Sequence, residues 1–179
     1  VEVAKLNSSY WGPKYVGAKR VTTFTNGKTV AKAEVKDAAI DFNVYVSRGE
    51  VALKLAKAMK LDMSDTNSPF ADVKPSSKYA AAATALYKEG IFTGDDKGKF
   101  NPNSPLTRAQ LAKILVVAFD LEKEGKAPAF KDVPSSHWSN LYVATLASTG
   151  ITEGKGDGTF GADEYVTWTH LNVFIERSK

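Results

Sequence analysis

Apolar residues recur every three or four positions in two stretches, residues 48–61 and 108–121, as on one face of an α-helix. The apolar positions are Val51, Leu55, Ala58, Leu61, Leu111, Ile114, Leu115, Ala118 and Leu121. Three lysines, Lys54, Lys57 and Lys113, fall on the opposite faces. Each stretch is therefore predicted to be a helix that buries one side and leaves the other in water.

A Ser or Thr precedes each of these helices, and a third such start follows at the same spacing: Ser47, Thr107 and Thr167. These residues are expected N-caps, because a side-chain oxygen there accepts a backbone N–H of the first turn. The third residue after each cap is Glu50, Gln110 or His170. A Glu or Gln at that position completes a capping box, which we expect in the first two helices.

The spacing of 60 positions extends to other residues, so the chain contains an internal repeat. The matched pairs are Phe70/Phe130, Asp72/Asp132, Val73/Val133, Gly90/Gly150, Ile91/Ile151, Gly94/Gly154, Gly98/Gly158 and Phe100/Phe160. One gap between Val73 and Gly90 brings Tyr79 opposite Trp138. Together with the three cap positions, these matches predict three copies of at least the second half of the repeat.

Within one repeat the pattern predicts a first helix, a glycine-rich loop and the capped second helix. Ser76-Ser77 and Ser135-Ser136 are expected to cap first helices that run to residues 88 and 148. A glycine in the left-handed conformation then ends each first helix, and Phe100 or Phe160 anchors the loop to the core. One helix pair is too small to fold alone, so three pairs are expected to pack around a shared axis.

The start of the first copy has two interpretations. Residues 8–16 resemble residues 135–143, which would make residues 8–61 one enlarged repeat; alternatively, residues 35–40 are the first helix of a repeat without a glycine loop. Residues 22–34, around Asn26-Gly27, favour a small β-hairpin. The predicted organisation is an N-terminal segment, 1–34, followed by repeats 35–66, 67–126 and 127–179.

Composition and charge narrow the function classes. The 179 residues are 43% apolar and 25% charged, with a net charge of +4, no Cys and no long basic run, so we expect no nucleic-acid partner. The absence of Cys excludes disulfides, thiolate zinc sites and Cys nucleophiles. No apolar run approaches the roughly 18 residues that span a bilayer, so membrane insertion is not expected. The chain starts at Val1 without a charged and apolar leader, so we expect any export signal to have been removed.

The repeated motifs resemble the S-layer homology domain, a family with a Thr-Arg-Ala-Glu signature. They are Phe-x-Asp-Val, Gly-Ile-x-x-Gly, Gly-x-Phe and Leu-Thr-Arg-Ala-Gln. The resemblance is strong over residues 67–121 and good over 127–179, where Trp168 replaces the signature arginine. The first copy retains Ser47-Arg48-Gly49-Glu50.

The resemblance implies a mainly α fold, in which three helix–loop–helix repeats form a pseudo-threefold bundle. It also implies non-covalent anchoring of a secreted protein to the bacterial cell wall or S-layer. The family's ligand is a secondary cell wall polysaccharide, commonly with a pyruvate ketal, and Arg48 and Arg108 would be the signature arginines that pair with its carboxylate. An Arg fork suits a carboxylate, whereas a cation at a helix start is otherwise unfavourable.

Other residues are assigned to the same glycan-binding grooves. Glu50 and Gln110 belong to the signature, Tyr79 and Trp138 offer rings for sugar stacking, and Gly94 and Gly154 let a hydroxyl approach the backbone. The alternative for Tyr79 and Trp138 is a place in the core, and for Asp72 and Asp132 a turn or cap. Because Trp168 stands in the third signature, at most two grooves are expected to bind in the family manner.

Other function classes receive less support from the residues. Loops around Gly98 and Gly158 place Lys at positions where calcium needs oxygen ligands, so no metal or cofactor is expected. The chain has two histidines. His137 is interpreted as a turn residue, and His170 as a cap or a solvated side chain. No nucleophile or metalloprotease motif appears, so the chain is not expected to be an enzyme, although a two-carboxylate glycosidase stays open. A module that contacts S-layer subunits without binding glycan is the remaining alternative.

Overall fold

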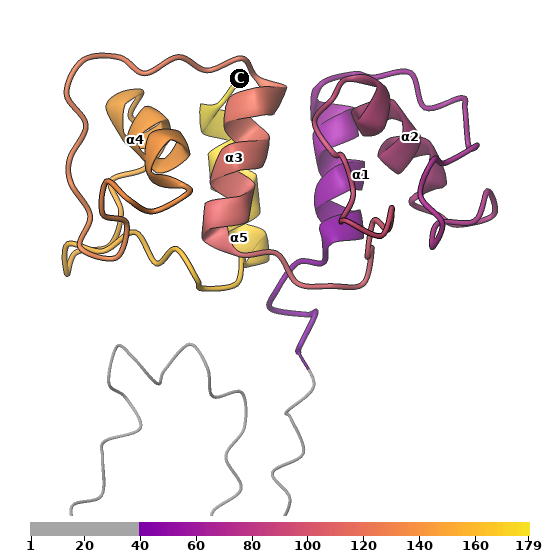
Figure 1. Cartoon of the computed structure of the whole chain (residues 1–179), viewed down its shortest axis with the longest axis horizontal. Helices are drawn as coiled ribbons and strands as arrows, with labels where there is room; N and C mark the ends of the chain where they lie inside the picture. Colours follow the sequence, from indigo (N-terminus) through magenta and orange to yellow (C-terminus); the bar gives the residue numbers. More distant parts are fainter. Residues whose placement is uncertain (1–39) are drawn as a thin grey trace, which may run out of the picture. The chain divides into compact units, whose positions relative to one another are not determined.

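The computed structural model describes residues 40–179, and its elements are helices joined by loops and turns (Figure 1). The helices are α1 (Arg48–Ala58), α2 (Ala80–Lys88), α3 (Arg108–Ala118), α4 (Asn140–Ser148) and α5 (Trp168–Arg177). Pairing between extended segments of this part is limited to three isolated β-bridges. The prediction of a mainly helical fold is confirmed. The hairpin at 22–34, and the residues that would decide the start of the first copy, lie outside the described residues.

Helices α1, α3 and α5 each begin directly after the N-cap residue predicted from the sequence. The side chains of Ser47, Thr107 and Thr167 accept the N–H of the third helical residue at 3.3, 3.3 and 3.2 Å. The capping box is complete at α3, where Gln110 Oε1 accepts the backbone N–H of Thr107 at 3.0 Å. The box predicted for α1 is wrong, because the Glu50 carboxylate instead accepts hydrogen bonds from Lys78 and Tyr79.

Helices α2 and α4 begin later than the sequence predicted. The Ser-Ser pairs lie in a turn, and the N-caps are Tyr79 and Ser139, which form no side-chain cap bond. Ser77 Oγ accepts the N–H of Tyr79 at 3.2 Å, so this serine closes the turn before the helix. The predicted ends are confirmed, because Gly90 and Gly150 follow the helices with φ of 71° and 76°.

The turns before α2 and α4 also correct the alignment of the two aromatic residues. Equivalent hydrogen bonds, Ala80 N–H to Ser77 O and Asn140 N–H to His137 O, lie 60 positions apart without a gap. Tyr79 is therefore equivalent to Ser139, and Trp138 to Lys78. Tyr79 is 8% exposed, as its core reading predicted, whereas Trp138 is 55% exposed, so the core reading of Trp138 is wrong.

The helices pack in pairs that cross the repeat boundaries. Helix α2 packs against α1 and α4 against α3 (Figure 1). Helix α1 also contacts α5. With the predicted repeat boundaries, the first helix of each repeat would therefore pack on the second helix of the preceding one. The shared core contains Phe100 and Phe160, both fully buried as predicted.

Three short segments bring the starts of α1, α3 and α5 together. Tyr45 pairs with Thr167, Ser47 with Pro105 and Thr107 with Tyr165, so each segment pairs with both others. The first N–H of each helix is also donated across copies: from Arg48 to Ser104 O, from Arg108 to Glu164 O and from Trp168 to Val44 O. These bonds hold the three signature positions at the junctions between copies.

Candidate functional site

Arg108, the first residue of α3, is a buried cation. It is 4% exposed, and its Nε donates a hydrogen bond to the carbonyl oxygen of Phe160 at 2.9 Å. Its guanidinium carbon lies 4.7 Å from the ring centroid of Phe160 and 5.3 Å from that of Phe174. Aromatic faces attract a cation, so these rings hold the guanidinium in a fixed orientation.

No ion pair within residues 40–179 involves Arg108. Burial lowers the pKa of its guanidinium, while the more distant charges of Glu164 and Asp132 raise it. A buried charge is costly unless it is paired, and the terminal nitrogens of Arg108 have no hydrogen-bond acceptor among the described residues. These terminal nitrogens are therefore available as donors to an anion.

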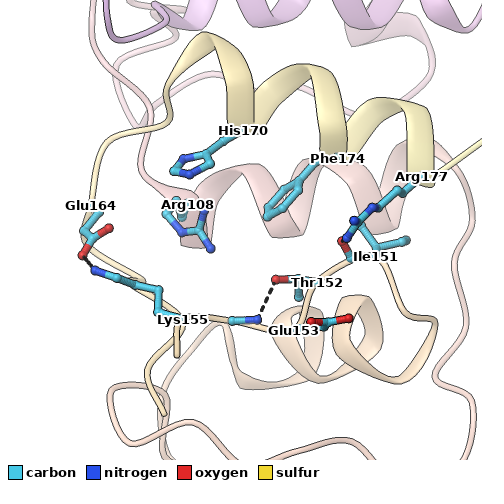
Figure 2. Close-up of a pocket in the computed structure, with 10 residues that line it drawn as sticks. Arg108, Ile151, Thr152, Glu153, Lys155, Glu164, His170, Phe174 and Arg177 are labelled. Carbon is cyan, nitrogen blue, oxygen red and sulfur yellow. Dashed lines mark hydrogen bonds and ion pairs between the residues drawn. The ribbon is translucent and has the colours of Figure 1, made fainter. Parts of the chain in front are cut away.

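Arg108 lines a pocket of about 240 Å³, here called the Arg108 pocket (Figure 2). The start of α3, the loop after α4 and the inner face of α5 contribute its walls. The lining residues are Arg108, Ile151, Thr152, Glu153, Gly154, Lys155, Glu164, His170, Phe174 and Arg177. In Figure 2 the Arg108 guanidinium lies between His170, Phe174 and Thr152, which come from different parts of the chain.

The charges around the pocket are mixed, with cations in excess. Lys155 forms an ion pair with Glu164, and a terminal nitrogen of Arg177 donates to the carbonyl oxygen of Ile151 at 3.2 Å. With Arg108, the pocket thus has three cations against the carboxylates of Glu153 and Glu164. An anion that enters meets a net positive wall.

His170 contributes an imidazole to the same pocket. Its backbone N–H bonds the Thr167 cap as predicted, and its half-buried ring stacks on Phe174 with centroids 6.4 Å apart. Nδ1 is buried without a hydrogen-bond partner among the described residues. Burial, and next the charge of Arg108, lower the pKa of this imidazole, so the ring is neutral near pH 7.

The loop under Arg108 is held by Asp132 and Gly154. The carboxylate of Asp132 accepts the N–H groups of Phe160, Gly161 and Ala162 at 2.7, 2.8 and 2.8 Å, which positions the carbonyl that Arg108 contacts. This confirms the turn reading of Asp132. Gly154 has φ of 77°, and a Cβ there would lie 2.3 Å from a Phe130 ring carbon. Packing alone thus accounts for this glycine.

Arg48, at the start of α1, lies 60 positions before Arg108 and has similar surroundings. Its guanidinium carbon lies 4.7 Å from the ring centroid of Phe92 and 5.3 Å from that of Phe100. It is half-buried, and its Nε is buried without a partner among the described residues. Burial lowers the pKa of Arg48, while the negative charges of Asp95 and Asp72 raise it. An anion here would meet Asp95, where the Arg108 pocket has Lys155.

A second pocket, of about 250 Å³, lies beside the third signature position. It is lined by Phe42, Ser47, Glu50, Lys78, Tyr79, Asn103 and Trp168. The Tyr79 hydroxyl and Lys78 donate to one Glu50 oxygen at 3.0 and 2.6 Å, and these partners, Lys78 foremost, lower the pKa of Glu50 against the effect of burial. Trp168 Nε1 donates to Phe42 O at 3.1 Å, which fixes the indole.

The repeated segments match a known family. Residues 69–112 and 129–167 fit the S-layer homology domain. Two segments of this chain are thus similar to the S-layer homology domain. Both matched segments span the loop anchored by Asp72 or Asp132; the first extends into α3, and the second ends at Thr167, the N-cap of α5.

Relatives of these S-layer homology segments are parts of larger proteins. A surface-layer 125 kDa protein of Lysinibacillus sphaericus is 38% identical over 66% of this chain and 10% of its own length. The exoglucanase XynX of Acetivibrio thermocellus is 33% identical over 73% of this chain and 12% of its own. A cellulosome-anchoring protein of the same species is 29% identical over 74% of this chain and 32% of its own. The chain thus spans a small part of each relative's length.

The residues predicted for one site are distributed over several places. Arg108 and Gly154 share the Arg108 pocket, and Glu50 and Tyr79 share the second pocket. Exposed Gln110 caps α3, and Gly94 packs under Phe70, whose ring carbon would lie 2.9 Å from a Cβ. Trp138 is exposed and lines neither pocket.

The sequence did not predict five of the side chains that line the pocket with Arg108: Lys155, Glu164, His170, Phe174 and Arg177. A usable signal was present, because Lys155 and Arg177 occupy positions that hold Asp95 and Val117 one repeat earlier. In the described part of the chain no three His, Asp or Glu side chains gather as a metal site. No helix there is long and apolar enough to cross a bilayer.

Proposed function

We propose that this chain anchors a secreted protein to the bacterial cell wall by binding an acidic secondary cell wall polysaccharide at Arg108. The carboxylate of a pyruvate ketal is the group that the Arg108 guanidinium would bind. The supporting observation is a nearly fully buried arginine that lacks an ion pair and lines a pocket. The surface-layer and cellulosome-anchoring relatives are consistent with a location at the cell surface.

The physical basis is the strength of a hydrogen bond between two charged groups. A carboxylate would accept from the terminal nitrogens of Arg108, and such charge-assisted bonds are worth about 1.5–3 kcal/mol each. The rings of Phe160 and Phe174 lie against the guanidinium and shield it in part from water, which strengthens the attraction. A volume of about 240 Å³ is near the small end of ligand pockets and fits one sugar unit better than a long stretch.

The three-copy architecture is part of this proposal. Residues 35–66, 67–126 and 127–179 would be three repeats after an N-terminal segment 1–34, arranged about a pseudo-threefold axis. The closed set of bridges among the segments before α1, α3 and α5 supports this arrangement. Arg48 would provide a second, weaker carboxylate site, next to Gly94. Glu50, Tyr79, Gln110 and Trp138 would contact neighbouring sugars of the same polymer.

The chain itself would bind and not catalyse. Of the two carboxylates in the Arg108 pocket, that of Glu164 is paired with Lys155, which does not suit a general acid. Incubation with the polysaccharide would test this point, since a glycosidase would release sugar over time. Activities named for relatives, such as the exoglucanase, belong to proteins of which this chain matches a small part.

The experiment compares purified cell-wall polysaccharide with the same material after mild acid removal of its ketals. Wild type is expected to bind the first and lose most affinity for the second. Arg108→Met, which keeps the apolar stem and removes the charge, should lower affinity at least tenfold, as expected for one lost charged bond. Arg48→Met is the matched variant at the equivalent position and should lose less. Equal affinities of the three proteins for both preparations would contradict the proposal.

A protein-interaction module is the second candidate, and exposed apolar side chains favour it. Trp138 and Leu141, at the start of α4, are 55% and 63% exposed, and the Trp138 ring lies 6.5 Å from that of Tyr142. Such patches often mark contacts between proteins. Sedimentation of wild type and Trp138→Ser would decide: concentration-dependent association that the substitution removes, without glycan binding, supports this alternative.

A further inference from the structure

We propose that His170 is a proton-linked partner of Arg108: when a carboxylate enters the Arg108 pocket, the imidazole takes up a proton and holds the same anion. Binding would then strengthen as the pH falls. This inference rests on the proposed function, because it concerns the same pocket. It adds that attachment responds to acidity and assigns the response to one residue.

The geometry places His170 at the anion position. The ring projects from α5 into the pocket beside Arg108 and is held parallel to Phe174, with an interplanar angle of 27° (Figure 2). Its Nδ1 is buried and has no partner among the described residues. Buried polar atoms are normally paired, so no neighbouring side chain or backbone group fixes the protonation of this ring, which lines the pocket beside Arg108.

The charges that face His170 come from every element around it. Arg108 at the start of α3 and Lys155 in the loop after α4 disfavour a proton on the ring, while Glu164 favours it. Arg177, on α5 itself, also lines the pocket. Burial has the largest effect, and together with these cations it lowers the pKa of His170 when no anion is bound.

A bound carboxylate reverses this balance. Its negative charge offsets Arg108 and lies next to the imidazole, so it raises the pKa of His170. Affinity is therefore constant above the pKa of the bound state, increases as the pH falls below it, and levels off below the pKa of the free state. Each unit between the two pKa values corresponds to a tenfold change in affinity.

Of the three helices α1, α3 and α5, only α5 has a histidine at its third position. The same helix position holds Glu50 in α1, whose negative charge would oppose an anion, and Gln110 in α3, which does not titrate in this range. Only His170 can gain a charge between pH 5 and 8. His137 lies before α4, lines neither pocket and hydrogen-bonds Ser139, which makes it the matched control.

The test is calorimetry of the full chain with ketal-bearing polysaccharide between pH 5.0 and 8.0, in two buffers of different ionisation enthalpy. Wild type and His137→Gln are expected to bind roughly tenfold more tightly at pH 5.0 than at pH 8.0 and to take up a fraction of a proton per bound ketal near pH 6. His170→Gln, which has the residue of the α3 copy, should show no proton uptake and a flat pH profile. A flat wild-type profile, or one that His170→Gln leaves intact, would overturn this inference and leave anchoring intact.

A second measurement separates the two proposals and needs no substitution of His170. The imidazole protons of wild type are titrated by NMR with and without sodium pyruvate as the carboxylate probe, and His137→Gln identifies the two signals. Pyruvate should raise the pKa of His170 and leave that of His137 unchanged. An unshifted His170 would contradict the inference. Failure of the polysaccharide to bind, with His170 shifted by pyruvate, would contradict only the proposed ligand.

Discussion

Arg48 and Arg108 occupy equivalent places in successive repeats but have different surroundings. Both guanidinium carbons lie 4.7 and 5.3 Å from the centroids of two phenyl rings. The rings around Arg48 come from Phe92 and Phe100 of the loop, whereas those around Arg108 come from the loop residue Phe160 and from Phe174 of α5. The repeat thus preserves a cation between two rings while exchanging the residues that supply them.

The different neighbouring residues change the shape and charge of the surface beside each arginine. At the position of Phe92 the later repeat has Thr152, whose hydroxyl accepts the N–H of Gly154 at 3.1 Å and whose smaller side chain lines the pocket. At the position of Asp95 it has Lys155. The shared helices therefore fix the place of the cation, and a few loop residues decide whether an anion is attracted to it.

The largest expected difference concerns the glycines under the two arginines. Gly154→Ala should lower the free energy of unfolding by about 3–4 kcal/mol, because a Cβ would lie 2.3 Å from Phe130 and 2.8 Å from Thr159 O at positive φ. Gly94→Ala should cost about 2–3 kcal/mol, since its closest contact would be 2.9 Å. Gly90→Ala, with open space around it, is the control and should cost only about 1 kcal/mol. Urea denaturation gives the three values, and equal losses would contradict this account.

The next largest difference is expected between the stability losses caused by replacing the two loop aspartates, Asp132 and Asp72. Asp132→Ala removes the acceptor of three backbone N–H groups and should cost about 3 kcal/mol, against about 2 kcal/mol for Asp72→Ala, which removes two. Burial pushes the pKa of Asp132 up, but the N–H groups of Ala162, Phe160 and Gly161 together bring it below its ordinary value. Its stabilising effect is therefore complete above about pH 4 and is lost as the pH falls through the lowered pKa. Urea denaturation at pH 7 and pH 3 should show the gap between wild type and Asp132→Ala shrinking; a constant gap would argue against it.

A packing exchange between copies can be tested by a double-mutant cycle. A Cβ on Gly49 would lie 2.7 Å from the Tyr79 ring, whereas the equivalent residues one repeat later are Ala109 and Ser139. Gly49→Ala should cost about 2 kcal/mol in wild type, because the ring must move. In a Tyr79→Ser background the same change should stabilise by up to about 1 kcal/mol, since alanine is the better helix former. Thermal unfolding of the four proteins measures the coupling, and an unchanged sign would refute the exchange.

The smallest effect on stability is expected from Lys155→Asp, which should change the free energy of unfolding by less than about 1 kcal/mol, because surface ion pairs contribute little. The reverse exchange, Asp95→Lys, also removes the acceptor of the Lys97 and Lys99 N–H groups and of the Asn101 amide, and should destabilise the fold more. Their effects on carboxylate affinity should be opposite in sign, roughly fivefold weaker at the Arg108 pocket and fivefold stronger at Arg48. Titration with ketal-bearing polysaccharide, with the other arginine replaced by Met, isolates each site. Affinities that both fall, or stay level, would contradict the role of these charges.

The sequence allowed good prediction of local structure. The caps at Ser47, Thr107 and Thr167, the glycines that end α2 and α4, and the buried Phe100 and Phe160 follow from short-range chemistry that neighbouring residues determine. The starts of α2 and α4 were misplaced because serine caps turns as readily as helices. The misplaced gap then put Trp138 in the position of a core residue.

The pocket could not be predicted in the same way. The Nε of Arg108 meets the carbonyl of Phe160, 52 positions away, and His170 and Phe174 reach it from another helix. Such contacts depend on which copies pack together, and the sequence repeat suggests that the two helices of one copy should pair. The structure pairs helices from adjacent copies instead.

Because of this pairing, the stretch of sequence that repeats differs from the stretch whose two helices pack together. A cut at a boundary between repeats, for instance before residue 127, would leave α3 without α4, although each piece would contain a whole number of sequence motifs. A fragment that begins at α1 and ends after α2 would keep its helix pair. Gene duplication can therefore add copies by joining sequence motifs end to end, yet every added copy must complete the core of the one before it. Interdependence of this kind gives an array of repeats the cooperativity of a single fold.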